Sequence, residues 1–93
     1  MAITAEFQTG IAHVVGCERM AVEIDGPATV EIVLRALAAA DPKIAAALIE
    51  DDGTLDLSLL IAINDRVIPR SSWSAHGIRD GATVEVHVAF VGG

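Results

Sequence analysis

The sequence predicts an α+β domain in which a sheet of about five strands packs one face on a main helix, with a short second helix after it. Several runs alternate apolar and polar residues with a period of two, as strands with one buried face do. A separate run repeats its apolar residues at helical spacing. A chain of 93 residues is long enough for one domain, which we place at 1–93.

The first two runs of alternation predict a hairpin. Residues 3–8 place Ile, Ala and Phe on one side and polar residues on the other, and residues 19–25 repeat the pattern. Gly10 and Gly16 lie between the runs, so the intervening segment 9–18 is expected to form a long or bulged hairpin loop.

The main helix is expected to begin after Thr29, whose hydroxyl is suited to cap the first turn. The apolar stripe of this helix consists of Val30, Val33, Leu34 and Leu37. Asp41-Pro42 should interrupt it, because the residue before proline is disfavoured in the α conformation. A second short helix over 44–49 and an acidic loop over 50–53 are expected next.

The run from Leu57 to Ile63 alternates, yet Leu60 and Ala62 make its second face apolar as well. We therefore expect this strand to be covered on both sides or to lie at an interface. A tight turn at Asn64-Asp65 and a short return strand at 67–68 should follow.

Pro69 restricts the return strand to an edge of the sheet. Residues 70–79 show no clean period, and Trp73 is expected to attach this segment to the body of the domain. The clearest strand comes last, with Val84, Val86, Val88 and Phe90 on one side. It leads through Val91 into Gly92-Gly93.

Composition excludes several classes of function. Thirteen acidic residues against six basic ones give a formal charge of -7, which disfavours nucleic acid or an anionic membrane as a partner. No run approaches the roughly 20 apolar residues of a membrane-spanning helix, and the first residues do not resemble a secretory leader. We expect a cytoplasmic protein. The single cysteine excludes an internal disulfide and a four-cysteine metal or iron–sulfur site.

The side chains offer little chemistry. His13, His76 and His87 lack the spacing of metal ligands, and Cys17 has no activating neighbour in the sequence. The acidic residues of 50–56 lack calcium-loop spacing and are expected to be solvated. We therefore expect no metal, no bound cofactor and no catalytic residues.

The carboxyl end is the remaining candidate site. Gly92 and Gly93 carry no Cβ atoms, so this segment could thread a narrow channel. Its terminal carboxylate has an ordinary pKa of about 3.5, is ionised at neutral pH and is a poor electrophile. It could donate an acyl group only after activation, which adenylation with ATP achieves. The alternative for the terminus alone is a frayed end without function.

Several motifs resemble the ubiquitin-like β-grasp sulfur carriers of the MoaD/ThiS family. They are the helix pattern from Ala28 to Leu37, Ile61-Ala62-Ile63-Asn64-Asp65, Asp80-Gly81 and the terminal Gly92-Gly93. The resemblance implies a mixed sheet, and an adenylating enzyme that uses ATP to activate Gly93. A sulfur donor would then displace AMP to give a thiocarboxylate, which a downstream synthase would accept. Gly92 and Val91 would thread into these enzymes, and the carrier itself would be no enzyme.

The sulfur-accepting pathway stays open at this point. The length, the alanine-rich second helix and the 50–56 loop resemble the small subunit of molybdopterin synthase, whereas 68–73 resembles the thiamin-thiazole carrier. Cysteine, tRNA-thiolation and natural-product pathways are also possible. Two further alternatives are a ubiquitin-like protein modifier, which would form isopeptide-linked conjugates, and a non-catalytic β-grasp interaction subunit, which would keep its activity without Gly92-Gly93.

Overall fold

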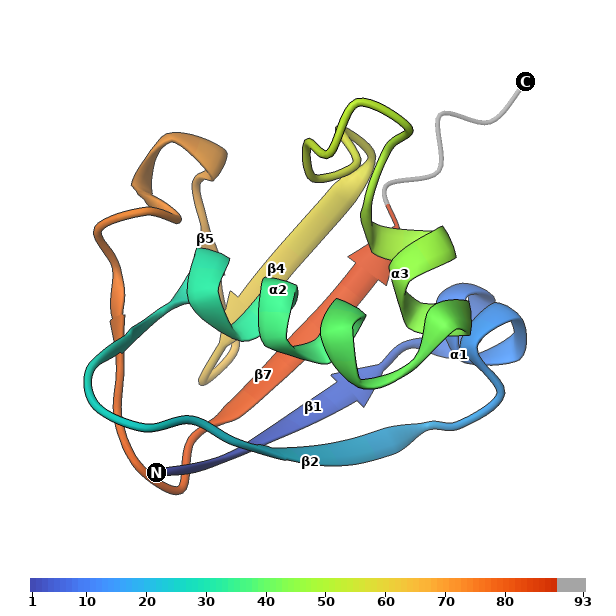
Figure 1. Ribbon diagram of the computed structural model, residues 1–93. Coiled ribbons are helices and arrows are strands. Elements are labelled where there is room, and N and C mark those ends of the chain that lie inside the picture. The colour runs from blue at the N-terminus through green and yellow to red at the C-terminus, as the bar shows by residue number, and fades with distance from the viewer. Residues whose placement is uncertain (89–93) are drawn as a thin grey trace.

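The computed structural model describes residues 1–88, and its strands form one main sheet with helices against one face (Figure 1). The strands are β1 (Ala2–Phe7), β2 (Arg19–Glu23), β3 (Ala28–Thr29), β4 (Leu59–Ile63), β5 (Arg66–Ile68), β6 (Gly77–Ile78) and β7 (Thr83–Val88). The helices are α1 (Thr9–Val15), α2 (Val30–Ala40), α3 (Pro42–Leu48) and the 3₁₀ turn η1 (Arg70–Ser72).

The main sheet has the strand order β2-β1-β7-β4-β5, so the last strand in sequence lies at its centre. β7 pairs in parallel with β1 and antiparallel with β4, while the two outer pairs are antiparallel. The predicted mixed sheet of five strands is confirmed. A separate pair of short strands, β3 and β6, each of two residues, was not predicted.

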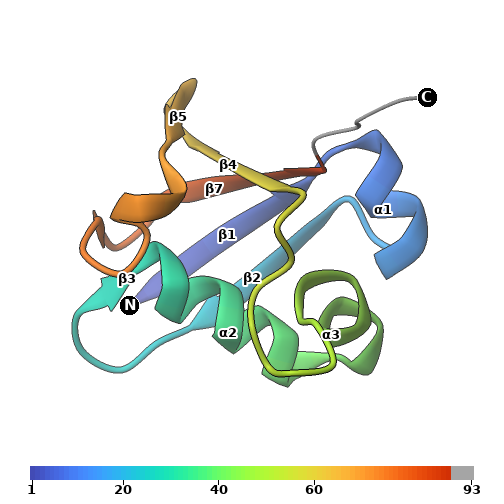
Figure 2. The same ribbon diagram turned by 90° about the horizontal axis from the view of Figure 1, so that it is seen from above.

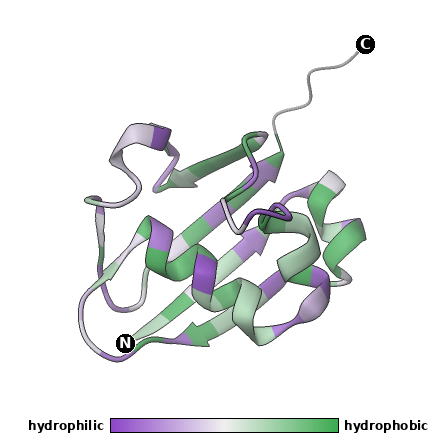
Figure 3. Ribbon diagram, turned by 45° about the horizontal axis from the view of Figure 1, so that its top comes forward, coloured by the Kyte–Doolittle hydropathy of each residue, from purple (hydrophilic) through white to green (hydrophobic). Residues whose placement is uncertain are grey.

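The core lies between the inner face of the sheet and the helices α2 and α3. The apolar stripe predicted for the main helix is buried, and Val30, Val33, Leu34 and Leu37 have no exposed surface. Figure 3 shows the hydrophobic and hydrophilic bands of this helix. The strands contribute the inward half of their alternation, including Ile3, Ile61 and Val84. Burial of these aliphatic side chains is the main stabilisation of the domain.

The predicted start of α2 is confirmed, whereas α3 begins at Pro42, two residues before the expected range 44–49. The Thr29 hydroxyl accepts a hydrogen bond from the Ile32 amide at 3.3 Å, which caps α2. The Asp41 carboxylate accepts one from the Lys43 amide at 2.8 Å, and Pro42 occupies the first turn of α3. The break between the two helices therefore follows from Asp41-Pro42.

The prediction of a loop over 9–18 is wrong, because α1 occupies most of it. Ile11 and Val15, one helical turn apart, are each 3% exposed, so the segment buries an apolar edge. Gly16 ends the helix in the left-handed conformation with φ 82° and donates its amide to the Ala12 carbonyl. The hairpin on either side of α1, with β1 antiparallel to β2, is confirmed.

The strand β4 begins at Leu59, two residues later than predicted, and Leu57 is 86% exposed. The predicted turn is confirmed, since Asn64 and Asp65 both have positive φ, at 52° and 63°. β5 is an edge strand, as Pro69 predicted.

The expectation that β4 is covered on both sides is wrong. No helix of residues 1–88 lies over the outer face of the sheet (Figure 2), and Leu60 on that face is 37% exposed. Ala62 is 6% exposed because the larger Glu85 and Val67 flank it in register on the adjacent strands. The other expectation, that this strand lies at an interface, stays a prediction.

The irregular segment 70–79 is attached through Trp73, as expected. Its indole is 3% exposed and donates a hydrogen bond to the Ile68 carbonyl at 3.0 Å. A tryptophan whose N–H is satisfied can be buried without an unpaired polar group.

Replacing Val33 by aspartate should unfold the domain. Val33 has no exposed surface, and an unpaired carboxylate there would lower the free energy of unfolding by about 4 kcal/mol or more. Thermal denaturation followed by circular dichroism measures the effect. The matched control is Ile32→Asp, at a neighbouring position that is 43% exposed in the first turn of α2, where an acidic residue is tolerated. A Val33→Asp protein as stable as this control would contradict the assignment of the core.

Candidate functional site at the end of the last strand

The strand β7 leads to the predicted site and is firmly held in the sheet. It is hydrogen-bonded on both sides, and Val84 and Val86 have no exposed surface. Its last residue, Val88, pairs with Leu59 and is 41% exposed. The sequence-predicted site residues Val91, Gly92 and Gly93 lie outside residues 1–88. The structure therefore describes the place from which they continue. We call this end of the sheet, where Val88 pairs with Leu59, the exit edge.

The outer face of the sheet carries an apolar patch, of which the sequence indicated Leu60 and Ala62 but not Val67. We define the outer patch as Leu60, Ala62 and Val67, which lie side by side on β4 and β5 through the Ala62–Val67 register. Leu60 is 37% and Val67 54% exposed. A signal was present in the sequence, since β4 is apolar on both of its faces.

Charged side chains border the outer patch on β1, β2 and β7. The Glu6 carboxylate accepts a hydrogen bond from the Arg19 guanidinium at 2.9 Å, and Glu6 lies opposite Glu85 in the parallel register. His87 Nε2 is 3.6 Å from the Glu85 carboxylate. His87 is thus on the polar face of its strand, as its place in the alternation predicted, and no other histidine joins it in a metal site. Among residues 1–88 no group of three potential metal ligands is present.

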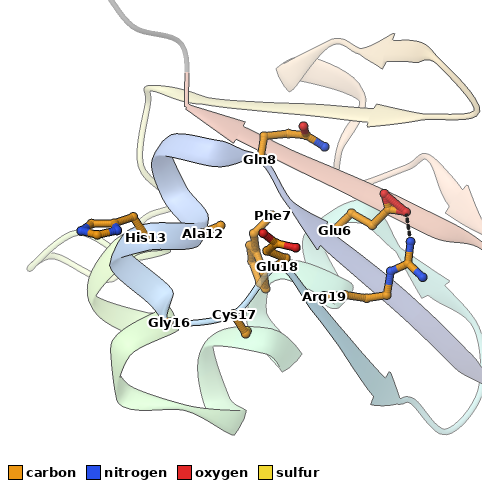
Figure 4. Close-up of a pocket in the computed structure, with 9 residues that line it drawn as sticks. All are labelled: Glu6, Phe7, Gln8, Ala12, His13, Gly16, Cys17, Glu18 and Arg19. Atoms are coloured by element: carbon orange, nitrogen blue, oxygen red, sulfur yellow. Dashed lines mark hydrogen bonds and ion pairs between the residues drawn. The ribbon is translucent and has the colours of Figure 1, made fainter.

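A surface hollow lies between α1 and the strands β1 and β2 (Figure 4). Its lining includes Cys17 and His13, whose side chains point in different directions (Figure 4). The imidazole is therefore not placed to take a proton from the thiol. In this part of the described chain the structure brings together no nucleophile and base.

The acidic loop after α3 contains a close pair of carboxyl groups. The negative charge of Asp56 and a hydrogen bond to it raise the pKa of Glu50. Hydrogen bonds from the Ser58 hydroxyl and amide, at 2.6 and 2.7 Å, hold the pKa of Asp56 below its usual range. The loop was expected to be a solvated charge run, and the structure adds that two of its carboxyl groups interact.

These features together define a small ubiquitin-like protein of the β-grasp fold, and comparison with known proteins agrees. The model of the ThiS family matches residues 10–93, and the chain belongs to that family. No helix within residues 1–88 has the length and apolar character needed to cross a membrane.

Several solved structures are similar to this chain in fold. SAMP1 from Haloferax volcanii is 24% identical, with 100% of both chains covered and a TM-score of 0.83. The Haloferax volcanii HVO 2177 protein is 31% identical over 100% of this chain and 87% of that chain, with a TM-score of 0.78.

A chain of the Amycolatopsis orientalis BexX/CysO complex is 25% identical, over 98% of this chain and 99% of that chain, with a TM-score of 0.68. Among curated proteins none matches the sequence. Family membership makes the chain a ubiquitin-like carrier or modifier protein.

The carboxyl pair predicts a pH-dependent effect on stability. A carboxyl group with a raised pKa stabilises the fold while it is protonated, and this contribution is lost as the pH rises through the raised pKa. Glu50→Gln should therefore raise the melting temperature at neutral pH, because it removes the charge beside Asp56. The gain should shrink as the pH falls through the raised pKa and should be lost below about 4.5, the ordinary pKa of the glutamate, where the carboxyl is protonated in the folded and unfolded states alike.

Melting temperatures measured by calorimetry across this pH range test the effect. Glu18→Gln, at an exposed position outside the loop, is the matched control. An equal gain in both variants at every pH would show that total charge, and not the Glu50–Asp56 pair, sets the difference.

Proposed function

We propose that this protein is a sulfur carrier whose terminal Gly93 carboxylate is adenylated by a partner enzyme and converted to a thiocarboxylate. The observation that supports this most is the ThiS family match, which extends through Gly92 and Gly93. The fold supports it as well. β7 is the central strand of the sheet, and its last residue, Val88, is partly exposed at the exit edge.

The chemistry needs a partner because the carboxylate is unreactive. An oxygen of the Gly93 carboxylate attacks the α-phosphate of ATP, which forms a mixed anhydride with AMP and releases pyrophosphate. A sulfide-level donor then attacks the carbonyl carbon, the C–S bond forms, and AMP leaves with the anhydride oxygen. The carrier supplies recognition and reach, and residues 89–93 extend at most about 17 Å from β7.

Glycine at the last two positions fits this role on steric grounds. A channel narrow enough to exclude water from the anhydride leaves little room for a Cβ atom. Val91, Gly92 and Gly93 are the residues that would occupy it. The acceptor of the sulfur would be a biosynthetic enzyme, and the similarity to a chain of the BexX/CysO complex supports a partner protein in general.

Incubation with ATP, a sulfide donor and the ubiquitin-activating-type enzyme of the source organism should modify the terminus. The intact mass should increase by the difference between one sulfur and one oxygen atom, located at Gly93 by fragmentation. Gly92→Val should block this change without altering the melting temperature, because a branched side chain obstructs the channel. An unmodified wild-type protein under these conditions would contradict the proposal.

The outer patch is the surface that we propose docks on the adenylating enzyme. It is apolar, Leu60 and Val67 in it are exposed, and its strand β4 pairs directly with β7, so a protein bound there lies beside the strand that leads to Gly93. Burial of its leucine and valine would supply the apolar centre that interfaces need, and the neighbouring Glu85 and Glu6 would form a polar rim.

Leu60→Glu should raise the KM for the carrier in ATP–pyrophosphate exchange by about tenfold, because it places a charge in the centre of the interface. The melting temperature should change little, since Leu60 is already 37% exposed. Ala21→Glu introduces the same charge on the same face, at an exposed position on the distant strand β2. If both variants bind equally well, docking takes place elsewhere.

A protein modifier is the second candidate, because SAMP1 is described as a small archaeal modifier protein. Activation of Gly93 is common to both functions, but a modifier ends in an isopeptide bond to lysine. Affinity capture from cells under denaturing conditions separates them. Ladders of higher mass that resist denaturation would support the modifier, whereas a terminal thiocarboxylate without ladders supports the carrier.

A further inference from the structure

Leu57 is the most exposed large apolar side chain of residues 1–88. It is 86% exposed, whereas Val14, the next in order, is 59% exposed. Single apolar residues are common on protein surfaces and need no explanation by themselves. Leu57 differs in that the turn carrying it is held by a set of specific contacts.

The backbone on both sides of Leu57 is fixed by hydrogen bonds. The Asp56 carboxylate accepts from the Ser58 amide at 2.7 Å and from its hydroxyl at 2.6 Å. The Asp56 amide donates to the Leu48 carbonyl at 2.8 Å, which ties the turn to the end of α3. Leu57 is therefore presented on a defined turn.

Arg70 fastens the same turn from the other side. Its guanidinium donates to the carbonyls of Leu55 at 2.7 Å and Asp56 at 2.9 Å. It also stacks 4.6 Å from the ring centroid of Trp73, which is buried. The contacts thus extend from the core through Arg70 to the residues just before Leu57. A side chain held in place in this way loses little conformational entropy when a partner buries it.

The position of Leu57 relates it to the proposed function. It precedes Leu59 by two residues, and Leu59 pairs with Val88, the last described residue of β7. Leu57 and the 41% exposed Val88 are therefore both at the exit edge. Because 89–93 span at most about 17 Å, an enzyme that encloses Gly93 must approach this edge closely.

We propose that Leu57 is an anchor residue that inserts into an apolar socket at the mouth of the adenylating enzyme's channel. This inference rests on the proposed function and adds a second contact to the outer patch. The exposed acidic residues 50–52 lie on the same loop, so the socket is expected to have a basic rim. Arg70 is a positioning residue, which acts by holding the turn.

ATP–pyrophosphate exchange with the ubiquitin-activating-type enzyme of the source organism tests the proposal. Leu57→Ser should raise the KM for the carrier by about ten- to thirtyfold with kcat unchanged, as loss of an anchor contact does. Ile32→Ser, which removes a 43% exposed apolar side chain from α2, should leave the KM unchanged. Melting temperatures confirm that both variants are folded.

A double-mutant cycle separates positioning from general stability. Arg70→Lys keeps the charge but loses the paired hydrogen bonds and the planar stacking, so it should raise the KM by itself. Combined with Leu57→Ser it should add nothing further, because the side chain that it positions is gone.

The outcomes distinguish the inference from the function on which it rests. Wild-type exchange with an unchanged KM for Leu57→Ser would overturn the anchor, and so would an equal loss in Ile32→Ser. Additive effects of the two variants in the cycle would overturn the positioning role of Arg70. No exchange with the wild-type protein would overturn the proposed function, and the anchor with it.

Discussion

The pairing of β7 between β1 and β4 is the constraint on which the rest of the structure depends. A central strand has both of its hydrogen-bonding edges satisfied, so its position is set by two neighbours instead of one. Its inward Val84 and Val86 are fully buried, which fixes the face that it presents. Because this strand is also the last one of residues 1–88, the place from which the chain continues is set by a strand that is hydrogen-bonded on both sides.

The sheet divides the molecule into a stabilising side and a side available for recognition. The inner face receives α2 and α3, and the aliphatic residues there account for the hydrophobic core. The outer face carries no helix within residues 1–88 (Figure 2), so substitutions of its exposed side chains are expected to cost little stability. This separation would let contacts on the outer face form and dissociate while the core is unaffected.

Sequence reasoning located the elements with a long, regular pattern and missed those without one. The alternation of β7 and the capped apolar stripe of α2 each extend over several residues, and both were predicted correctly. In α1 the burial of Ile11 and Val15 was obscured by Gly10, which lies inside the helix, and by Gly16, which caps it. The pair β3–β6 has two residues a strand, too few for any period to be visible.

Only the part of the candidate site that depends on residues adjacent in the sequence could be predicted. Two glycines after a strand can be read from the sequence, and they fall outside residues 1–88. The contacts of Arg70 with Leu55 and Asp56 join residues about fifteen apart, so no local pattern could have indicated them. Leu57 itself was misassigned to β4, because the alternation continues beyond the point at which pairing with β7 ends.

The parallel arrangement of β1 and β7 has a practical consequence. Parallel neighbours begin at the same end of a sheet, so Met1 lies at the opposite end from Val88 (Figure 1). Among residues 1–88 its amino group contacts the Glu23 carboxylate at 3.3 Å and the Ile24 carbonyl at 3.1 Å. A fluorescent label or an immobilising linker joined at this amino group would therefore sit at the far end of the sheet from Val88, where it would leave the end of β7 open to a binding protein.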